Sequence, residues 1–78
     1  MTSTRVAIVG YGYIAHYHAR AVQAADGMDL VGILGREPAK RNEFAELYGL
    51  KRRYAQVEEL AADADVDAVV IAWPNALH

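Results

Sequence analysis

An α/β fold built on a doubly wound parallel sheet is predicted by two features of the sequence. Short apolar runs alternate with stretches of helical periodicity, in the order strand, helix, strand, helix, strand, helix, strand. Glycine or proline follows the principal apolar runs and marks where they end. Right-handed crossovers then give four parallel strands in the order 3-2-1-4, with a ligand crevice at the carboxyl ends of the strands.

The first helix and the strands on either side of it are the most clearly outlined. Residues 5–9 are apolar and mostly β-branched, which predicts a strand buried on both faces. Helical spacing follows from residue 14 to about residue 25 and ends at Asp26 and Gly27, before a second strand over residues 28–35. One face of this helix carries small and apolar residues, namely Ala15, Ala19 and Val22, and another carries His16, Arg20 and Gln23.

Proline and glycine delimit the second helix. Pro38 suits a first helical turn, because its missing N–H would have no partner there, and Gly49 suits the stop. The side chains predicted to point inward are Phe44, Leu47 and Tyr48.

The last three elements are shorter. Residues 51–55 predict a brief third strand, and residues 67–73 predict a fourth strand with the strongest apolar run in the chain, ended by Pro74 and Asn75. Between these strands, a short third helix is predicted from the spacing of Val57, Leu60, Ala61 and Ala64.

Composition narrows the classes of protein. The 78 residues allow one small domain, and the absence of cysteine excludes disulfides and thiolate metal sites. A net charge of -2 gives no basic excess for nucleic acid or an anionic membrane. There is neither a signal-peptide pattern at the start nor an apolar run of membrane-spanning length, so we expect a cytoplasmic protein.

The turn over residues 10–15 reads Gly-Tyr-Gly-Tyr-Ile-Ala and fits the pattern G-x-G-x-x-A between a strand and a helix. The first glycine permits the tight turn, the second lets a pyrophosphate approach the backbone, and the small Ala15 lets helix and strand pack closely. The phosphates would meet the free N–H groups of the helix. The predicted dinucleotide contacts are Gly10, Tyr11, Gly12, Tyr13, Ile14 and Ala15; the two tyrosines either flank the cofactor or are simply exposed.

A second predicted contact lies at the end of the second strand. NAD-specific domains usually place a carboxylate there to bind the ribose, but this chain has Gly35 followed by Arg36. A guanidinium can hold a 2′-phosphate, so the pair favours NADP over NAD. Arg41, with Lys40, could add positive charge; the alternative is that these cations form a solvated helix face.

Three stretches resemble the amino-terminal part of the Gfo/Idh/MocA oxidoreductases, namely VAIVGYGYIAHYHARAV, REPAKRNEFAELYG and YAQVEELAADADVDAVVIAWPNALH. The resemblance implies a Rossmann domain that binds NAD or NADP, followed by an α+β domain that supplies most of the substrate pocket. It also implies a catalytic lysine in a Glu-Lys-Pro motif outside residues 1–78. We therefore expect these residues to be the amino-terminal part of the cofactor domain and to be inactive alone.

The resemblance also implies roles for the last residues. It places the segment Trp73, Pro74 and Asn75 close to the nicotinamide, although Trp73 replaces the usual threonine, and Asn75 could instead be only a turn residue. His18 matches a family position near the cofactor turn, or has a structural or surface role. No metal site is expected, because His16 and His18 are two apart and point to different helix faces, and His78 is the final residue.

Two functions are compatible with the sequence. The resemblance implies an oxidoreductase that moves hydride between nicotinamide and a hydroxyl-bearing carbon of a sugar, cyclitol or similar small molecule. That substrate would bind only the full-length protein. The alternative is a short non-catalytic nucleotide-binding or interaction module, whose exposed strand edges and uncovered sheet face favour a homo-oligomer or another partner.

Overall fold

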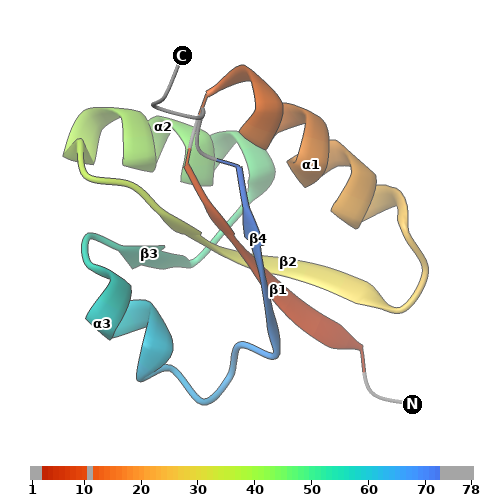
Figure 1. Cartoon of the computed structure of the whole chain (residues 1–78). Helices are drawn as coiled ribbons and strands as arrows, with labels where there is room; N and C mark the ends of the chain where they lie inside the picture. The colour runs from red at the N-terminus through yellow and green to blue at the C-terminus, as the bar shows by residue number, and fades with distance from the viewer. Residues whose placement is uncertain (1–2, 11, 73–78) are drawn as a thin grey trace.

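The computed structural model describes residues 3–10 and 12–72. Within these residues a parallel sheet in the order β3-β2-β1-β4 is flanked by three helices (Figure 1). The predicted Rossmann-like topology is therefore confirmed. The elements are β1 (Thr4–Val9), α1 (Tyr13–Ala24), β2 (Met28–Leu34), α2 (Pro38–Tyr48), β3 (Arg52–Tyr54), α3 (Val57–Ala61) and β4 (Ala68–Ile71).

The core lies on both faces of the sheet. Helices α1 and α2 cover one face and α3 lies on the other (Figure 1). Because side chains alternate along a strand, Ile8 of β1 packs toward α1 and α2, whereas Ala7 and Val9 pack toward α3. All three are buried, as expected for a strand covered on both faces.

Helix α2 begins and ends as predicted, with Pro38 in its first turn and Gly49 in the left-handed conformation at φ 70°. Its buried face differs from the prediction, because Leu47 is 64 % exposed and Ala45 is buried instead. A helix turns by about 100° per residue, so Phe44, Tyr48 and Ala45 span an arc of about 100° and Leu47 falls about 60° outside it. The inward stripe is therefore Phe44, Ala45 and the half-buried Tyr48.

The third helix is shorter than predicted. It ends at Ala61, and Ala64 lies in the loop before β4. A capping box fixes its start, in which the Glu59 carboxylate accepts hydrogen bonds from the N–H groups of Ala55 (2.7 Å) and Gln56 (2.9 Å). Among its apolar side chains, only Leu60 is buried.

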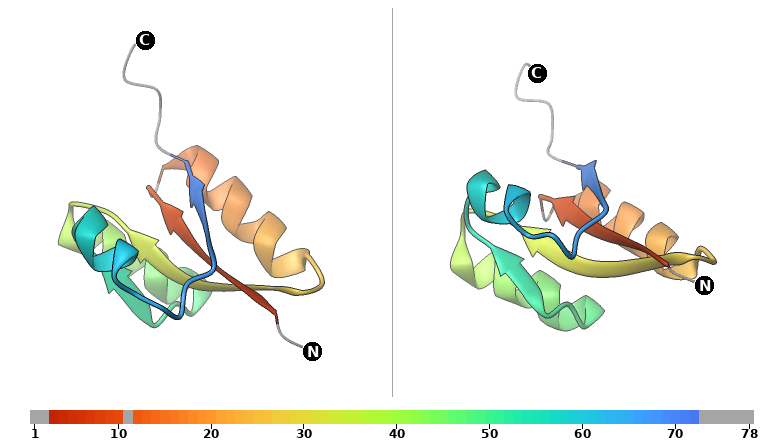
Figure 2. Two further views of the ribbon diagram at one scale, coloured as in Figure 1. Left: turned by 60° about the horizontal axis from the view of Figure 1, so that its bottom comes forward. Right: turned by 90° about the horizontal axis from the view of Figure 1, so that it is seen from below.

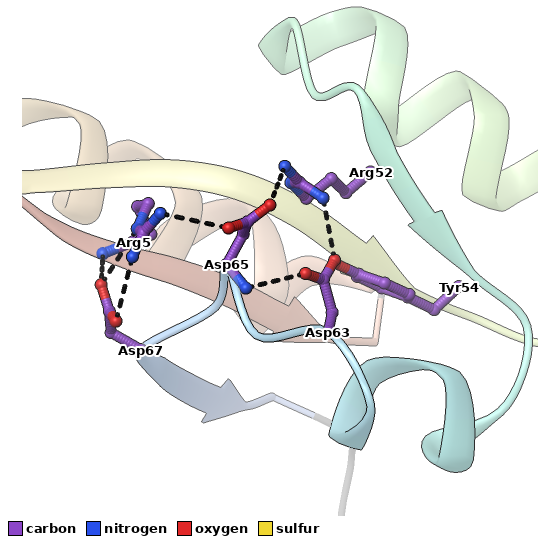
Figure 3. A network of polar contacts seen from close by, with 6 residues as sticks. All are labelled: Arg5, Arg52, Tyr54, Asp63, Asp65 and Asp67. Carbon is purple, nitrogen blue, oxygen red and sulfur yellow. Dashed lines mark hydrogen bonds and ion pairs between the residues drawn. The ribbon is translucent and has the colours of Figure 1, made fainter.

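Four ion pairs connect the α3–β4 loop to β1 and β3 (Figure 3). Arg5 of β1 pairs with Asp65 and Asp67, and Arg52 of β3 pairs with Asp63 and Asp65. Asp67 accepts hydrogen bonds from the N–H of Arg5 at 2.9 Å and from its Nε at 3.2 Å. Asp63 accepts from the Tyr54 hydroxyl at 2.6 Å and from Arg52 at 3.0 Å. This network holds the α3–β4 loop against the sheet. The loop has few apolar side chains that could do so by burial.

Stability is expected to fall in acid because of this network. The hydrogen bond from the Tyr54 hydroxyl lowers the pKa of Asp63 below its ordinary value of 3.8, and the backbone N–H of Arg5 does the same for the pKa of Asp67. A carboxylate with a lowered folded pKa stabilises the fold above its unfolded pKa and loses that contribution as pH falls through the folded value. Urea midpoints should therefore drop between about pH 5 and about pH 2.

Asp63→Asn should flatten this acid-induced drop, because the variant has no carboxylate to protonate at that position. Asp29→Asn is the matched control, since it removes an exposed carboxylate at the start of β2, outside the network. Equal pH profiles for the wild-type chain and Asp63→Asn would contradict the assigned role of Asp63.

Candidate functional site

The carboxyl ends of the strands meet at one edge of the sheet, next to the start of α1. Gly10 donates its N–H to the carbonyl of Leu34 at 2.9 Å, and Gly35 donates to the carbonyl of Tyr54 at 3.1 Å. These bonds place the glycine turn after β1 beside the turn after β2. Two of the sequence-predicted segments therefore lie at the edge of the sheet where this topology predicts a ligand crevice.

The two glycines of the first turn differ in what they require. Gly10 has φ 108°, a backbone conformation that L side chains rarely adopt, so the turn itself needs glycine there. Gly12 has an ordinary φ of -84°, and a Cβ built on it would lie more than 4 Å from other atoms of the described chain. Nothing in the described fold therefore requires glycine at position 12. Among the described residues, the space in front of Gly12 is open.

The start of α1 offers backbone donors toward the same volume. Gly12 is its N-cap and makes no side-chain cap, and the first turn contains no acidic residue. The first helical hydrogen bond runs from the N–H of His16 to the carbonyl of Gly12, at 3.1 Å. The amide N–H groups of residues 13–15 therefore have no carbonyl partner within the helix. Such free N–H groups at a helix N-terminus can donate hydrogen bonds to an anion.

The remaining residues of the glycine motif divide into buried and exposed positions. Ala15 is fully buried against the core around Ile8, which confirms that the small residue allows close packing of α1 on β1. Ile14 is 47 % exposed and Tyr13 is 86 % exposed. Tyr11 lies outside the described residues.

The turn after β2 carries the cationic part of the site. Arg41 Nη1 donates to the carbonyl of Gly35 at 2.7 Å, so this guanidinium is held against the turn. Its Nε is buried and has no hydrogen-bond partner among the described residues. Arg36 is exposed. The structure therefore brings Gly35, Arg36 and Arg41 together, and Arg41 also orders the turn, a role that the sequence did not reveal.

Arg36 lines an open hollow of about 330 Å³ between the end of β2 and the start of α3. Ala55 and Gln56 form part of its wall, and the capping box fixes the backbone there. Glu58 lines the same hollow, so a carboxylate partly offsets the positive charge of Arg36. In the sequence, Gln56 followed three residues later by Glu59 is a capping-box pattern that fixes this wall. The prediction of the third helix did not use this pattern.

The two described histidines occupy different environments. His16 Nδ1 lies 2.7 Å from the Tyr48 hydroxyl, and its ring packs on Phe44 with 4.7 Å between centroids. This contact joins α1 to α2. His18 is half-buried and meets Tyr17 edge to face, with 5.6 Å between ring centroids.

Across residues 3–10 and 12–72, no three histidine, aspartate or glutamate side chains gather so that they could hold a metal ion. In that part of the chain, no helix has both the length and the apolar character needed to cross a membrane. The predicted nicotinamide contacts, Trp73, Pro74 and Asn75, and also His78, lie outside the described residues.

Comparison with known proteins agrees with this geometry. Residues 4–78 match the model of the Gfo/Idh/MocA family, described as an oxidoreductase family with an NAD-binding Rossmann fold. The chain is 32 % identical, over 95 % of its length, to 4-carboxy-2-hydroxymuconate-6-semialdehyde dehydrogenase of Sphingobium sp., and 31 % identical, again over 95 %, to an NADP(+) scyllo-inositol 2-dehydrogenase of Bacillus subtilis. It covers 24 % and 23 % of these relatives, and so about a quarter of their length.

Among solved structures, an Agrobacterium radiobacter oxidoreductase in complex with NAD+, L-tartaric acid and magnesium superimposes with a TM-score of 0.88 at 28 % identity. The match covers 99 % of this chain and 22 % of that one. Fold, glycine turn and family match therefore agree, and this chain belongs to the Gfo/Idh/MocA oxidoreductases, whose NAD-binding Rossmann fold it matches over residues 4–78.

Proposed function

We propose that residues 1–78 are the amino-terminal part of the dinucleotide-binding domain of an oxidoreductase and that they bind NADP in preference to NAD. The observation that carries the proposal is Gly12: the described fold does not require glycine there, yet Gly12 is the N-cap of α1 and makes no side-chain cap. A pyrophosphate that approaches this turn needs such an opening. When bound, the nicotinamide accepts or donates a hydride.

In this proposal residues 10–15 hold the pyrophosphate. The amides at the start of α1 donate hydrogen bonds to phosphate oxygens, and the buried Ala15 keeps these amides in place against β1. Tyr13 and Ile14, both exposed, flank the phosphates, as does Tyr11. In the same proposal His18, half-buried on α1, lies near the pyrophosphate; the alternative is a structural or surface role.

The preference for NADP rests on the turn after β2. Gly35 stands where a carboxylate would exclude a 2′-phosphate, and the Arg36 guanidinium beside it is exposed. Arg41 donates a hydrogen bond to the carbonyl of Gly35 and so holds the turn in place. The named cofactors of the relatives include NADP(+) for the Bacillus enzyme and NAD+ for the Agrobacterium structure, so the family name alone does not determine the choice.

The reaction we propose is hydride transfer between nicotinamide and a hydroxyl-bearing carbon of a sugar, cyclitol or similar small molecule, in the cytoplasm. The inositol dehydrogenase among the relatives supports this substrate class. Residues 73–75 would contact the nicotinamide end. In this proposal the proton-transfer residue and most of the substrate pocket lie outside residues 1–78, as the family resemblance implies, so these residues alone should bind cofactor and not turn over substrate.

Arg36→Ala tests the cofactor preference. The loss of one charge-assisted contact to the 2′-phosphate should weaken NADP binding by about tenfold to about a hundredfold and leave NAD binding nearly unchanged. Isothermal titration calorimetry with both nucleotides measures the ratio. Lys51→Ala is the matched control, because it removes an exposed cation before β3, on the side away from the hollow. Equal losses for NADP and NAD in Arg36→Ala would refute the preference.

A further inference from the structure

The hollow beside Arg36 has a second wall, which comes from the start of α3. Leu34 and Arg36 line the hollow on the β2 side, and residues 55–58 line it on the α3 side. Both views of Figure 2 place the start of α3 next to the segment that leads from β2 to α2. At about 330 Å³ the hollow is at the small end of ligand pockets, so it has room for one end of a dinucleotide.

Hydrogen bonds fix this second wall beside the β2 turn. The N–H of Gly35 donates to the carbonyl of Tyr54 at 3.1 Å, which joins the turn after β2 to the end of β3. The Glu59 carboxylate accepts hydrogen bonds from the N–H groups of Ala55 and Gln56, at 2.7 Å and 2.9 Å. The start of α3 is therefore held in place beside the turn.

Two of the described side chains that line the hollow are charged, and their charges are opposite. Arg36 contributes a guanidinium and Glu58 contributes a carboxylate, and both residues are exposed. The neighbouring Glu59 differs, because its carboxylate is bonded to backbone N–H groups at the start of α3. An anionic group that enters the hollow therefore meets one cation and one anion.

We propose that Glu58 is a specificity-determining residue of the cofactor site, and that its negative charge limits the preference for NADP over NAD. This role rests on the proposed function, in which Arg36 holds the 2′-phosphate. A phosphate monoester carries about -1.5 to about -2 charge at pH 7, whereas the 2′-hydroxyl of NAD is neutral. NAD-specific domains usually place a carboxylate at the end of the second strand. This chain has Gly35 there, and a carboxylate lines the same hollow from α3 instead.

Repulsion through water determines the size of the effect. Glu58 is exposed, so its charge acts on the phosphate at high dielectric constant and the repulsion is modest. We expect Glu58 to reduce NADP affinity by about threefold to about tenfold, which is less than the effect of the Arg36 contact. The affinity for NAD should change little, because the 2′-hydroxyl carries no charge.

Glu58→Gln tests the proposal by calorimetric titration of the chain with NADP and, separately, with NAD. At low salt, NADP affinity should rise by about threefold to about tenfold, and NAD affinity should stay within about twofold of the wild type. Glu58→Lys reverses the charge and should raise NADP affinity further. Glutamine and lysine are good helix formers, so both variants should keep α3. The gain in Glu58→Gln should shrink in about 0.5 M NaCl, because salt screens exposed charges.

Glu46→Gln is the matched control, since it removes the same charge from an exposed position on α2, on the other face of the sheet. It should leave the ratio of NADP to NAD affinity unchanged. A purely structural role of Glu58 would change the affinities for both nucleotides alike. An unchanged ratio in Glu58→Gln, or an equal change of the ratio in Glu46→Gln, overturns the proposal.

Arg36→Ala separates this result from a failure of the proposed function. If Arg36→Ala lowers the ratio of NADP to NAD affinity and Glu58→Gln does not raise it, Glu58 has no such role and the proposed function stands. If the wild-type chain binds neither nucleotide, or if Arg36→Ala leaves the ratio unchanged, the proposed function fails and the role of Glu58 fails with it.

Discussion

Gly12→Val should weaken NADP binding by about tenfold to about a hundredfold while the chain stays folded. The valine side chain would fill the volume in front of the turn, which is free of other described atoms within 4 Å, and would keep the pyrophosphate from the amides of α1. Loss of one hydrogen bond to a charged group costs about 1.5–3 kcal/mol, and each 1.4 kcal/mol is about tenfold in affinity. Calorimetric titration with NADP measures the change.

The control for this variant must separate binding from folding. Ala21→Val adds the same branched side chain at an exposed position further along α1, so it should leave NADP affinity unchanged. Urea unfolding should show that both variants lose only about 1 kcal/mol or less, because neither site is filled by the chain itself. If Gly12→Val binds NADP as tightly as the wild type, then the pyrophosphate does not occupy this turn.

Gly32→Ala should lower the free energy of unfolding by about 1–3 kcal/mol. A Cβ on Gly32 would lie 2.8 Å from Cε2 of the Tyr54 ring and 3.2 Å from the Arg52 carbonyl oxygen. The Tyr54 ring has little room to move, since it is buried and its hydroxyl is held by Asp63 at 2.6 Å. Burial and this hydrogen bond also raise the pKa of the hydroxyl to about 12.

Urea denaturation of Gly32→Ala against Gly12→Ala isolates the steric cause, because the second variant adds the same methyl group in open space. A second comparison uses Tyr54→Ala. If the Tyr54 ring causes the clash, Gly32→Ala should cost less in the Tyr54→Ala background than in the wild type. Additive losses would show that the ring is not responsible.

Local features of the sequence predicted the strands, the first two helices and the glycine turn. Gly10 and Ala15 could be assigned because a tight turn and close helix packing each depend on one residue type, and the structure places both as expected. Leu47 was assigned wrongly, since apolar character alone does not show which part of α2 faces the core. The early end of α3 at Ala61 was also missed, since apolar spacing alone extended the helix to Ala64.

Contacts between distant residues could not be predicted in this way. The bond from Arg41 to the carbonyl of Gly35 depends on how α2 leaves β2, and the closeness of Gly32 to Tyr54 depends on the pairing of β2 with β3. Arg5 and Asp67 are 62 residues apart, and nothing near either of them in the sequence points to the other. Such partners become apparent only once the sheet order is known.

A two-dimensional amide NMR titration of the chain with NADP, and separately with NAD, reports folding and cofactor binding in one experiment. We expect a well-dispersed spectrum in which shifts concentrate at residues 10–15 and 35–41 and saturate at lower concentration with NADP than with NAD. A well-dispersed spectrum that neither nucleotide changes would contradict the claim that this chain forms a cofactor site by itself.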